Sequence, residues 1–211
     1  MADARDEKVW TKHSEEMMNL PQFKDHSCGP ITETIKELFP IGPVSVLDYG
    51  CGTAQWSSTF KDFQYHCYDQ NKDMIAGAMQ RMKALGIQPS GVYQSFWNEL
   101  QIDKTFDVIF TSAVIQHNLH GQKDLVLKQI LDLLKPGGVY ICLENTLEPE
   151  KNAFQFPRGY AFTDETSDGY SFTRIGWERY FKEHKFENIS DQFMKHWNQF
   201  KSDYYVLRKP L

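Results

Sequence analysis

A glycine-rich turn directly after an apolar run is the part of this sequence best suited to bind a ligand. The run Val44–Tyr49 ends at Gly50, Cys51 and Gly52. Because glycine has no Cβ, its backbone can approach a bound molecule closely. Asp48 and the N–H groups of the turn could then hold a charged or polar group. In an open parallel sheet, such a ligand lies beyond the carboxyl ends of the strands.

The spacing around this turn distinguishes between nucleotide-binding motifs. The dinucleotide pattern G-x-G-x-x-G is not met, because its third glycine position holds Gln55. The sequence also has no G-K-[ST] P-loop, which disfavours nucleoside triphosphate hydrolysis. Asp69 follows the turn by about twenty residues, at the end of the next apolar run. A carboxylate at that place can accept hydrogen bonds from both hydroxyls of a ribose.

Two histidines and one glutamate are the candidates for acid–base chemistry. His117 and His120 come just after the apolar run 106–111, and histidine is the side chain best suited to take a proton near neutral pH. His117 is either a general base or a structural residue, and His120 is either a second candidate or a solvent-exposed side chain. Glu144 follows the run 139–143 and is either an acceptor-orienting group or simply a strand terminus.

Apolar runs that alternate with amphipathic segments predict the elements that position these groups. Strands are expected at 44–49, 64–68, 91–94, 106–111 and 139–143. Helices are expected at 71–85 and 124–134, the second one stopped by Lys135-Pro136-Gly137-Gly138. Helical spacing places Met79 and Leu125 on the apolar faces of these helices. Repeated strand–helix–strand units predict an α/β fold, with a parallel sheet and helices on both faces.

The two ends of the chain differ from this core. Helices are expected at 6–19 and 31–38, around a loop at 24–30. The aromatic-rich segment 148–172 is either a lid over an apolar acceptor or packing over the sheet; its aromatic residues are Phe154, Phe156, Tyr160, Phe162, Tyr170 and Phe172. A helix at 173–184 precedes strands at 187–194 and 202–207, which predict an antiparallel hairpin that closes the sheet.

These elements predict one domain in four parts. Residues 1–40 form a helical cap, 41–147 the ligand-binding core, 148–172 the lid and 173–211 the C-terminal helix and closing strands.

Four segments of the sequence, in order, resemble one known family. The segment VLDYGCGTAQW resembles motif I of the class I S-adenosylmethionine (SAM)-dependent methyltransferases, whose pattern is hydrophobic-[DE]-x-G-x-G. The segments CYDQNKDMI, FDVIFTSAVIQH and LLKPGGVYICLEN continue the resemblance, which covers residues 31–145. It implies a three-layer Rossmann-like sheet, mostly parallel, with SAM as cofactor and S-adenosylhomocysteine as product.

The resemblance also implies which residues contact the cofactor. Asp48 and the turn from Gly50 through Cys51 to Gly52 would border the methionine and ribose parts of SAM, and Asp69 would bind the ribose hydroxyls. The other implied contacts are Gln70, Met74, Phe96, Trp97, Thr111 and Ser112. Gln70 would lie beside the adenine, and Thr111 and Ser112 near the sulfonium. Phe96 and Trp97 occupy the stretch where the family usually has an acidic residue for the adenine amino group, so backbone N–H groups and apolar packing would replace that acid.

Composition and charge narrow the choice of partners. A net charge of −5 and a pI of about 5.8 disfavour nucleic acid and favour a small-molecule acceptor, methylated at oxygen or nitrogen. No apolar stretch reaches the roughly 20 residues of a membrane span, and the N-terminal residues lack a signal-peptide core. We therefore expect a cytoplasmic monomer or homodimer. No Cys/His cluster has zinc spacing, so no metal is expected, and reduced thiols are predicted at Cys28, Cys51, Cys67 and Cys142.

Two other functions stay open. The layout is similar to that of protein N-terminal α-amine methyltransferases in its length, in the Phe96–Trp97 stretch and in Val114-Ile115 followed by His117. The acceptor would then be a peptide. A non-catalytic SAM-binding protein could also keep the same fold, because fold alone does not determine function.

Overall fold

A seven-stranded sheet with the order β3-β2-β1-β4-β5-β7-β6 forms the centre of the computed structural model, which describes residues 27–118, 120–144, 174–197 and 204–211. The strands are β1 (Ser45–Tyr49), β2 (Gln64–Asp69), β3 (Gly91–Gln94), β4 (Phe106–Ser112), β5 (Leu134–Leu143), β6 (Glu187–Asn188) and β7 (Tyr204–Arg208). The first five run parallel to one another, whereas β7 is antiparallel to both β5 and β6. The predicted parallel sheet with a closing antiparallel hairpin is confirmed.

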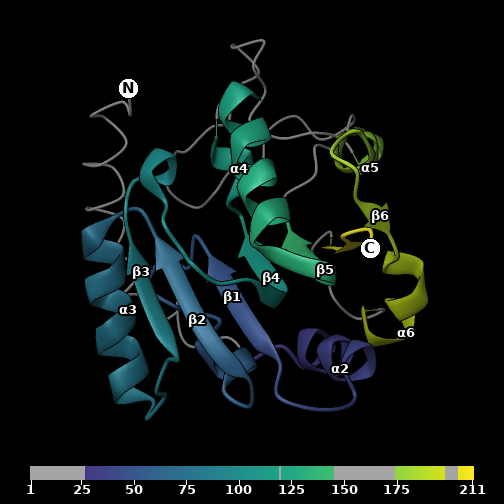
Figure 1. Cartoon of the computed structure of the whole chain (residues 1–211). Coiled ribbons are helices and arrows are strands. Elements are labelled where there is room, and N and C mark those ends of the chain that lie inside the picture. Colours follow the sequence, from purple (N-terminus) through teal and green to yellow (C-terminus); the bar gives the residue numbers. More distant parts are fainter. Residues whose placement is uncertain (1–26, 119, 145–173, 198–203) are drawn as a thin grey trace, which may run out of the picture.

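Helices cover both faces of this sheet. They are α2 (Gly29–Leu38), α3 (Lys72–Ala84), α4 (His120–Leu133), α5 (Arg174–Glu183) and α6 (Met194–Trp197), together with the short 3-10 helices η2 (Ser57–Phe60), η3 (Trp97–Glu99), η4 (Ile115–His117) and η5 (Ser190–Phe193). Figure 1 shows α3 along β3 and α2 beside α6. A buried hydrogen bond of 3.0 Å from Trp197 Nε1 to Thr34 Oγ1 joins α6 to α2.

Alternation along the strands produces two separate cores. In β1, Val46 belongs to the core under α2, α3 and α6, while its neighbour Leu47 belongs to the core under α4 and α5. Successive side chains of a strand point to opposite faces of the sheet, so a strand covered on both sides is apolar at nearly every position. The continuous apolar runs of the sequence therefore reflect a sheet buried on both faces.

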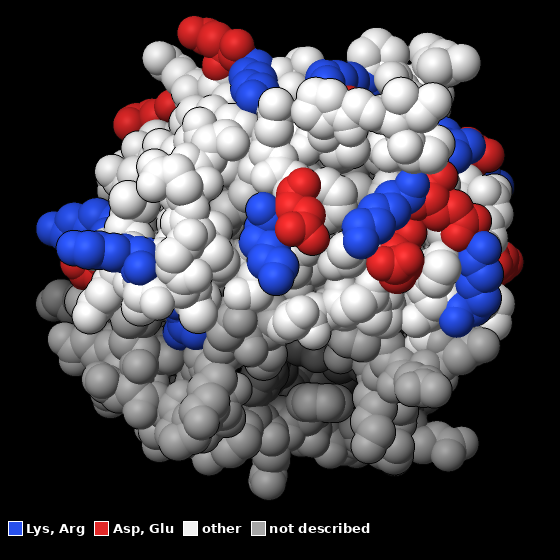
Figure 2. Space-filling model, turned by 90° about the horizontal axis from the view of Figure 1, so that it is seen from below, with Lys and Arg blue, Asp and Glu red and all other residues white. Residues whose placement is uncertain are grey.

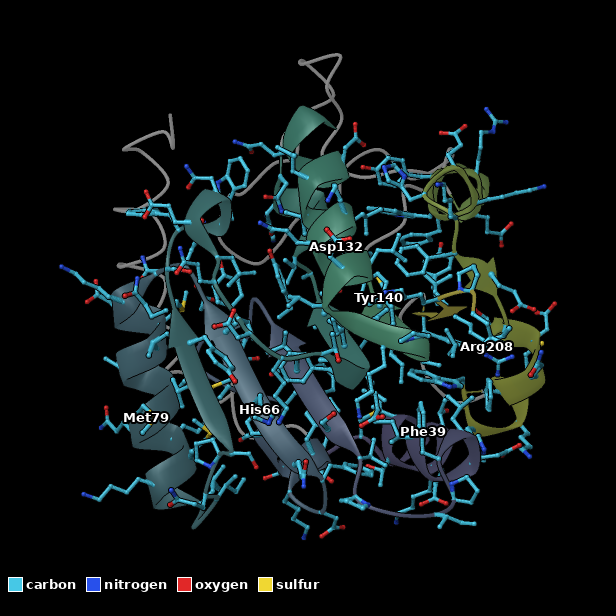
Figure 3. All side chains as sticks on the ribbon, in the orientation of Figure 1. Phe39, His66, Met79, Asp132, Tyr140 and Arg208 are labelled. Carbon is cyan, nitrogen blue, oxygen red and sulfur yellow. The ribbon has the colours of Figure 1, made fainter. Side chains whose placement is uncertain are left out.

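Two residues expected on apolar helix faces are exposed instead. Met79 lies on α3 at the outer edge of the molecule and is 44 % exposed (Figure 3). Leu125 in α4 is 46 % exposed, whereas the neighbouring Val126 is buried. In both helices the buried stripe is narrower than a count of apolar residues suggests. Single apolar residues at a protein surface are common.

The segment Lys135–Gly138 belongs to β5 rather than to a turn before it, which corrects the predicted start of that strand. Leu134 already pairs with Phe106, and the register then shifts so that Val139 pairs with Val108. The four intervening residues bulge from the ladder. A Cβ on Gly138 would lie 2.9 Å from the carbonyl oxygen of Lys135, so glycine permits this close approach.

The bounds of α2 and β6 also differ from expectation. Gly29 and Pro30 begin α2 instead of ending a loop, because proline is well accommodated in the first turn of a helix. The strand predicted at 187–194 stops at Asn188, whose Oδ1 accepts the N–H and the Oγ–H of Ser190 at 3.0 and 2.6 Å. This side-chain turn directs the chain into η5 and α6. The predicted helix 6–19 and the aromatic-rich segment 148–172 lie outside the described residues.

Candidate functional site

The predicted site residues gather at one edge of the sheet, where the parallel strands end. Gly50 follows β1, Asp69 ends β2, Ser112 ends β4 and Glu144 follows β5. The register explains this, since Tyr49 is paired with Tyr68 and Ser112 with Leu143. Parallel strands that end together bring their following residues together, which is where ligands bind in open α/β sheets.

The glycine turn is held by hydrogen bonds to β2. The N–H groups of Gly50 and Cys51 both donate to the carbonyl oxygen of Tyr68, at 2.8 and 2.9 Å. The N–H of Gly52 donates to Asp69 Oδ2 at 2.9 Å. Both glycines have positive φ, +72° and +54°. These three N–H groups are thus engaged within the protein, which corrects the expectation that they hold a polar group of the ligand.

Asp69 retains the capacity to bind hydroxyl groups. Its carboxylate accepts N–H groups from Gly52, Asn71 and Gln70, and burial outweighs them, so the pKa of Asp69 is raised. An ionised carboxylate offers about four acceptor positions, so three N–H donors do not exhaust it. A partly buried acceptor beside a glycine turn, at the end of the second strand, fits a ribose with two neighbouring hydroxyls.

Asp48, just before the turn, is buried rather than facing solvent. It is 1 % exposed, and Tyr65 donates its hydroxyl to Asp48 Oδ2 at 3.0 Å. Burial raises the pKa of Asp48 to about 7, the Tyr65 hydrogen bond opposes that rise, and the negative charge of Asp69 adds to it. The Cys51 thiol is also buried and donates to the carbonyl oxygen of Gly52 at 3.5 Å.

The segment after β4 packs against the glycine turn. Ala113 has a φ of +55°, and its N–H donates to the carbonyl oxygen of Leu143 at 2.8 Å. The next residue, Val114, lies so close to Gly50 that a Cβ built there would be 2.7 Å from Val114 Cγ2. The turn and the segment after β4 therefore form one continuous wall at this edge of the sheet.

Glu144 binds the backbone of that segment. Its Oε1 accepts the N–H groups of Val114 and Ile115 at 3.1 and 2.9 Å, and its Oε2 accepts the N–H of Gln116 at 3.1 Å. Burial raises the pKa of Glu144 to about 7, whereas the three N–H groups and the charge of Lys123 act in the opposite direction. Through these contacts Glu144 holds the loop in place. The sequence suggests either a group that orients the acceptor or a simple strand terminus, and neither interpretation includes this role.

The remaining predicted site residues differ in their exposure to solvent. Thr111 is fully buried, and its hydroxyl lies 2.8 Å from that of Tyr140, on the α4 side of the sheet. Met74, at the start of α3, is buried as well. The more open positions are Gln70, Ser112, Trp97 and His117, which are partly exposed, and Phe96, which is 43 % exposed.

His117 ends η4, and its Nε2 lies 3.4 Å from Gln116 Nε2. It belongs to the segment that Glu144 holds, so its place depends on that loop. His120 begins α4, but its side chain lies outside the described residues.

Sequence reasoning missed Lys123, which is fully buried in the first turns of α4. The signal was present, because Lys123 precedes the buried Leu127 and Ile130 by four and seven residues. A lysine on the apolar stripe of a helix must have an anionic partner when it is buried. Its charge acts on Glu144, which lies more than twenty residues away in the sequence.

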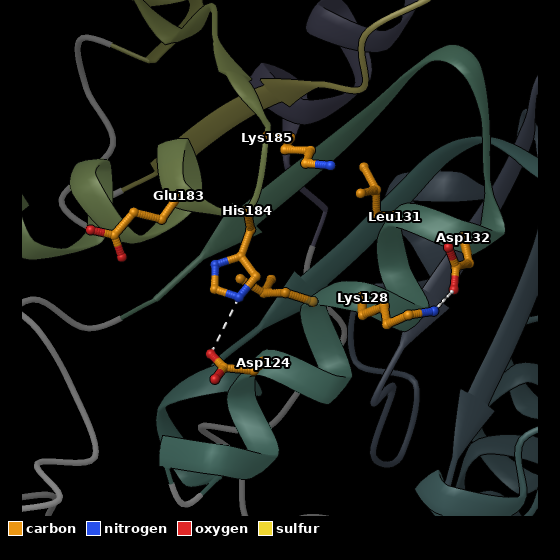
Figure 4. A pocket seen from close by; sticks show the side chains of 8 residues that line it. Asp124, Lys128, Leu131, Asp132, Glu183, His184 and Lys185 are labelled. Atoms are coloured by element: carbon orange, nitrogen blue, oxygen red, sulfur yellow. Dashed lines mark hydrogen bonds and ion pairs between the residues drawn. The ribbon is translucent and has the colours of Figure 1, made fainter.

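A groove between α4 and the end of α5 lies apart from these residues. Figure 4 shows His184 and Asp124 pointing toward each other there, with His184 Nε2 3.2 Å from Asp124 Oδ1. None of the predicted site residues lines this groove; its lining is Asp124, Leu127, Lys128, Leu131, Asp132, Glu183, His184 and Lys185.

Two further observations concern the described residues alone. They contain no group of three or more His, Cys, Asp or Glu side chains that could hold a metal ion. None of their helices is long and apolar enough to cross a membrane.

Comparison with known proteins agrees with this geometry. A family model described as a methyltransferase domain matches residues 43–172, more than half of the chain. The chain belongs to the class I SAM-dependent methyltransferases. The family match begins just before β1 and includes the glycine turn, Asp69 and Glu144.

The chain is also similar in sequence to demethylmenaquinone methyltransferases. The enzyme of Bacillus pumilus (strain SAFR-032) is 29 % identical over 162 residues, which cover 73 % of this chain and 65 % of that protein. The enzyme of Bacillus mycoides (strain KBAB4) is 30 % identical over 163 residues, with the same coverage. The chain thus spans less than two thirds of the length of these relatives.

Solved methyltransferase structures share the fold. A SAM-dependent methyltransferase from Clostridium acetobutylicum ATCC 824 has a TM-score of 0.68 at 15 % identity, covering 96 % of this chain and 100 % of that one. SAM-bound CalS10, an amino pentose methyltransferase from Micromonospora echinaspora, has a TM-score of 0.61 at 16 % identity, covering 95 % and 91 %. At such low identity the likeness concerns the fold alone.

Proposed function

We propose that this chain transfers a methyl group from SAM to an oxygen or nitrogen of a small-molecule acceptor. The observation that carries the proposal is the joint arrangement of the glycine turn, the Asp69 carboxylate and the segment after β4 at one edge of the sheet. The turn gives close backbone approach, the carboxylate suits a ribose, and the segment after β4 closes the wall beside them.

Each residue has a part in this assignment. Asp69 would accept the ribose hydroxyls, and Gly50 and Gly52 would border the ribose and methionine parts. Gln70, Phe96 and Trp97 would enclose the adenine, with apolar packing in place of an acidic side chain. Ser112 would lie near the methionine part, while the buried Asp48, Cys51, Met74 and Thr111 would support these groups from behind. When bound, SAM supplies a methyl group that its positive sulfur activates toward a nucleophile.

His117 is the residue we assign to proton removal from the acceptor. An oxygen or nitrogen nucleophile that carries a proton must lose it during transfer, and a neutral imidazole can accept it near neutral pH. His117 is partly exposed and belongs to the segment that flanks the glycine turn. The neighbouring Gln116 amide would donate to His117 Nε2 and so orient the ring, and the proton would be received at the other ring nitrogen, Nδ1. His120 is the second candidate.

A small molecule is favoured over a peptide or nucleic acid as acceptor. The curated relatives are named for demethylmenaquinone, which is a small molecule. The net charge of −5 disfavours a polyanion, and on the face shown in Figure 2 acidic and basic side chains lie intermixed rather than in a patch of one sign. A cytoplasmic location is part of the same proposal.

Calorimetry and a methyl-transfer assay together test the proposal. The chain is titrated with SAM and with S-adenosylhomocysteine, then incubated with SAM labelled in its methyl group and a panel of hydroquinones, phenols, amines and peptides. Binding followed by label transfer to a small molecule supports the proposal. Transfer to a peptide favours the N-terminal amine type, and binding without transfer to any acceptor favours a non-catalytic SAM-binding protein. Absence of SAM binding would overturn the assignment.

A further inference from the structure

The backbone from Ala113 to Gln116 takes its conformation from the end of β5. The N–H of Ala113 donates to the carbonyl oxygen of Leu143, and the next three N–H groups in the chain all donate to the carboxylate of Glu144. Four consecutive N–H groups are therefore bound by two consecutive residues. Ala113 adopts a left-handed φ of +55°, which a residue with a Cβ rarely takes unless its surroundings enforce it.

This loop contacts the glycine turn directly. Val114, the second residue that β5 holds, is the neighbour that a Cβ on Gly50 would meet at 2.7 Å. A displacement of Val114 would open or press on the turn. Because Gly50 and Cys51 are fixed on their other side by the carbonyl oxygen of Tyr68, the turn lies between β2 and the loop. The loop conformation thus determines one boundary of the proposed cofactor site.

A buried positive charge accompanies Glu144. Lys123 of α4 is fully buried, and its charge lowers the pKa of Glu144 against the effect of burial. Among the described residues, the charge of Glu144 also acts on Tyr140 and Cys142 of β5, where it raises the pKa of each. A buried charge is strongly destabilising where no opposite charge lies near it. Lys123 therefore favours a carboxylate at position 144 over a neutral side chain.

We propose that Glu144 is a positioning residue that fixes the backbone of Val114, Ile115 and Gln116 against the glycine turn, and thereby raises the affinity of the proposed site for the cofactor. This role rests on the proposed binding of SAM. It assigns to Glu144 no contact with the acceptor or the reacting methyl group.

Two variants of similar size test the role, Glu144→Gln and Glu144→Leu. Glutamine keeps one acceptor oxygen for Val114 and Ile115, but its amide group cannot accept the N–H of Gln116. Leucine accepts none of the three. The dissociation constant of S-adenosylhomocysteine is measured by calorimetry well below each melting temperature. We expect Glu144→Leu to bind at least about tenfold more weakly than the wild type, which is the loss typical of a charged hydrogen-bond acceptor. The affinity of Glu144→Gln should lie between those of the wild type and Glu144→Leu.

Hydrogen exchange gives a local readout. The amides of Val114, Ile115 and Gln116 should exchange faster in both variants, while those of β1 and β2 keep their protection. If Glu144→Leu does not fold, Glu144→Leu/Lys123→Met removes both buried charges and is measured instead.

The matched control is Lys209→Met at the opposite end of α4. Lys209 Nζ donates to the carbonyl oxygens of Leu131 and Leu134, so its loss should lower the melting temperature without changing the affinity. If the wild-type chain binds S-adenosylhomocysteine and both Glu144 variants bind it with the same affinity, the positioning role is overturned while the proposed function stands. A wild-type chain that does not bind S-adenosylhomocysteine overturns the proposed function itself.

Discussion

Asp69 accepts the backbone N–H of Gly52 at 2.9 Å and so connects the end of β2 to the turn that follows β1. One carboxylate thus shapes the turn and offers its remaining acceptor positions to a ligand. A substitution at this position has two effects, since it removes ligand contacts and also frees the turn.

Asp69→Ala should weaken SAM binding by about 1–3 kcal/mol, because the hydrogen bonds of a charged acceptor are lost. Calorimetric titration with SAM measures the change. Asp62→Ala, on the exposed surface just before β2, is the matched control and should bind SAM as the wild type does. Unchanged affinity in Asp69→Ala would show the ribose assignment to be wrong.

Gly50→Ala should damage both folding and cofactor binding. The φ of +72° at Gly50 costs an L-residue about 1–2 kcal/mol, and the added Cβ would press on Val114 Cγ2. Urea unfolding measures the first effect and calorimetry the second. In Gly50→Ala/Val114→Ala the steric part is relieved, so affinity should partly recover while the backbone cost remains. A double variant no better than the single one would argue against contact between the turn and the loop.

Repeating features of the fold could be predicted from the sequence, because they depend on near neighbours in the chain. The apolar runs 44–49 and 106–111 are strands since a sheet buried on both faces requires apolar residues at successive positions. The places of the glycine turn and Asp69 could be predicted because each lies at the carboxyl end of such a strand.

Contacts between distant segments could not be predicted in this way. Glu144 binds a loop about thirty residues before it, and nothing local to Glu144 indicates that three N–H groups converge there. The early end of β6 depends on one side-chain turn at Asn188, which competes with an otherwise plausible strand pattern. Such details are determined by tertiary contacts, which override local preference.

Asp48 should make the stability of the protein fall as the pH rises. Its pKa is raised from an ordinary value near 4 to about 7 in the folded chain. Because the pKa is higher in the folded chain, the contribution of Asp48 to the unfolding free energy is complete below its unfolded-state pKa. That contribution is lost as the pH rises from there through about 7. Between pH 5 and pH 8 this single group should cost about 2–3 kcal/mol of unfolding free energy.

Comparison with Asp48→Asn isolates that contribution. Asparagine has the same shape, can still accept the Tyr65 hydroxyl and does not titrate. His66, whose pKa burial lowers to about 4, contributes the opposite slope up to its ordinary value. Because His66 is present in both proteins, it cancels in the difference between their urea unfolding curves. Equal pH dependence in the two proteins would show that Asp48 does not titrate in this range.

Lys209→Met should destabilise the fold by about 1–2 kcal/mol, because a charged donor to two carbonyl oxygens is lost. Lys209 Nζ lies 2.8 Å from the carbonyl oxygen of Leu131 and 2.7 Å from that of Leu134, so it caps the C-terminal end of α4 where the helix dipole is negative. Methionine keeps the length of the apolar stem, which confines the change to the charge and the hydrogen bonds. Thermal unfolding should show the loss, and Lys128→Met, an exposed residue of α4 in an i,i+4 pair with Asp132, should change stability by no more than about 0.5 kcal/mol. Equal effects of the two substitutions would mean that the cap at the end of α4 contributes no more than an ordinary surface ion pair.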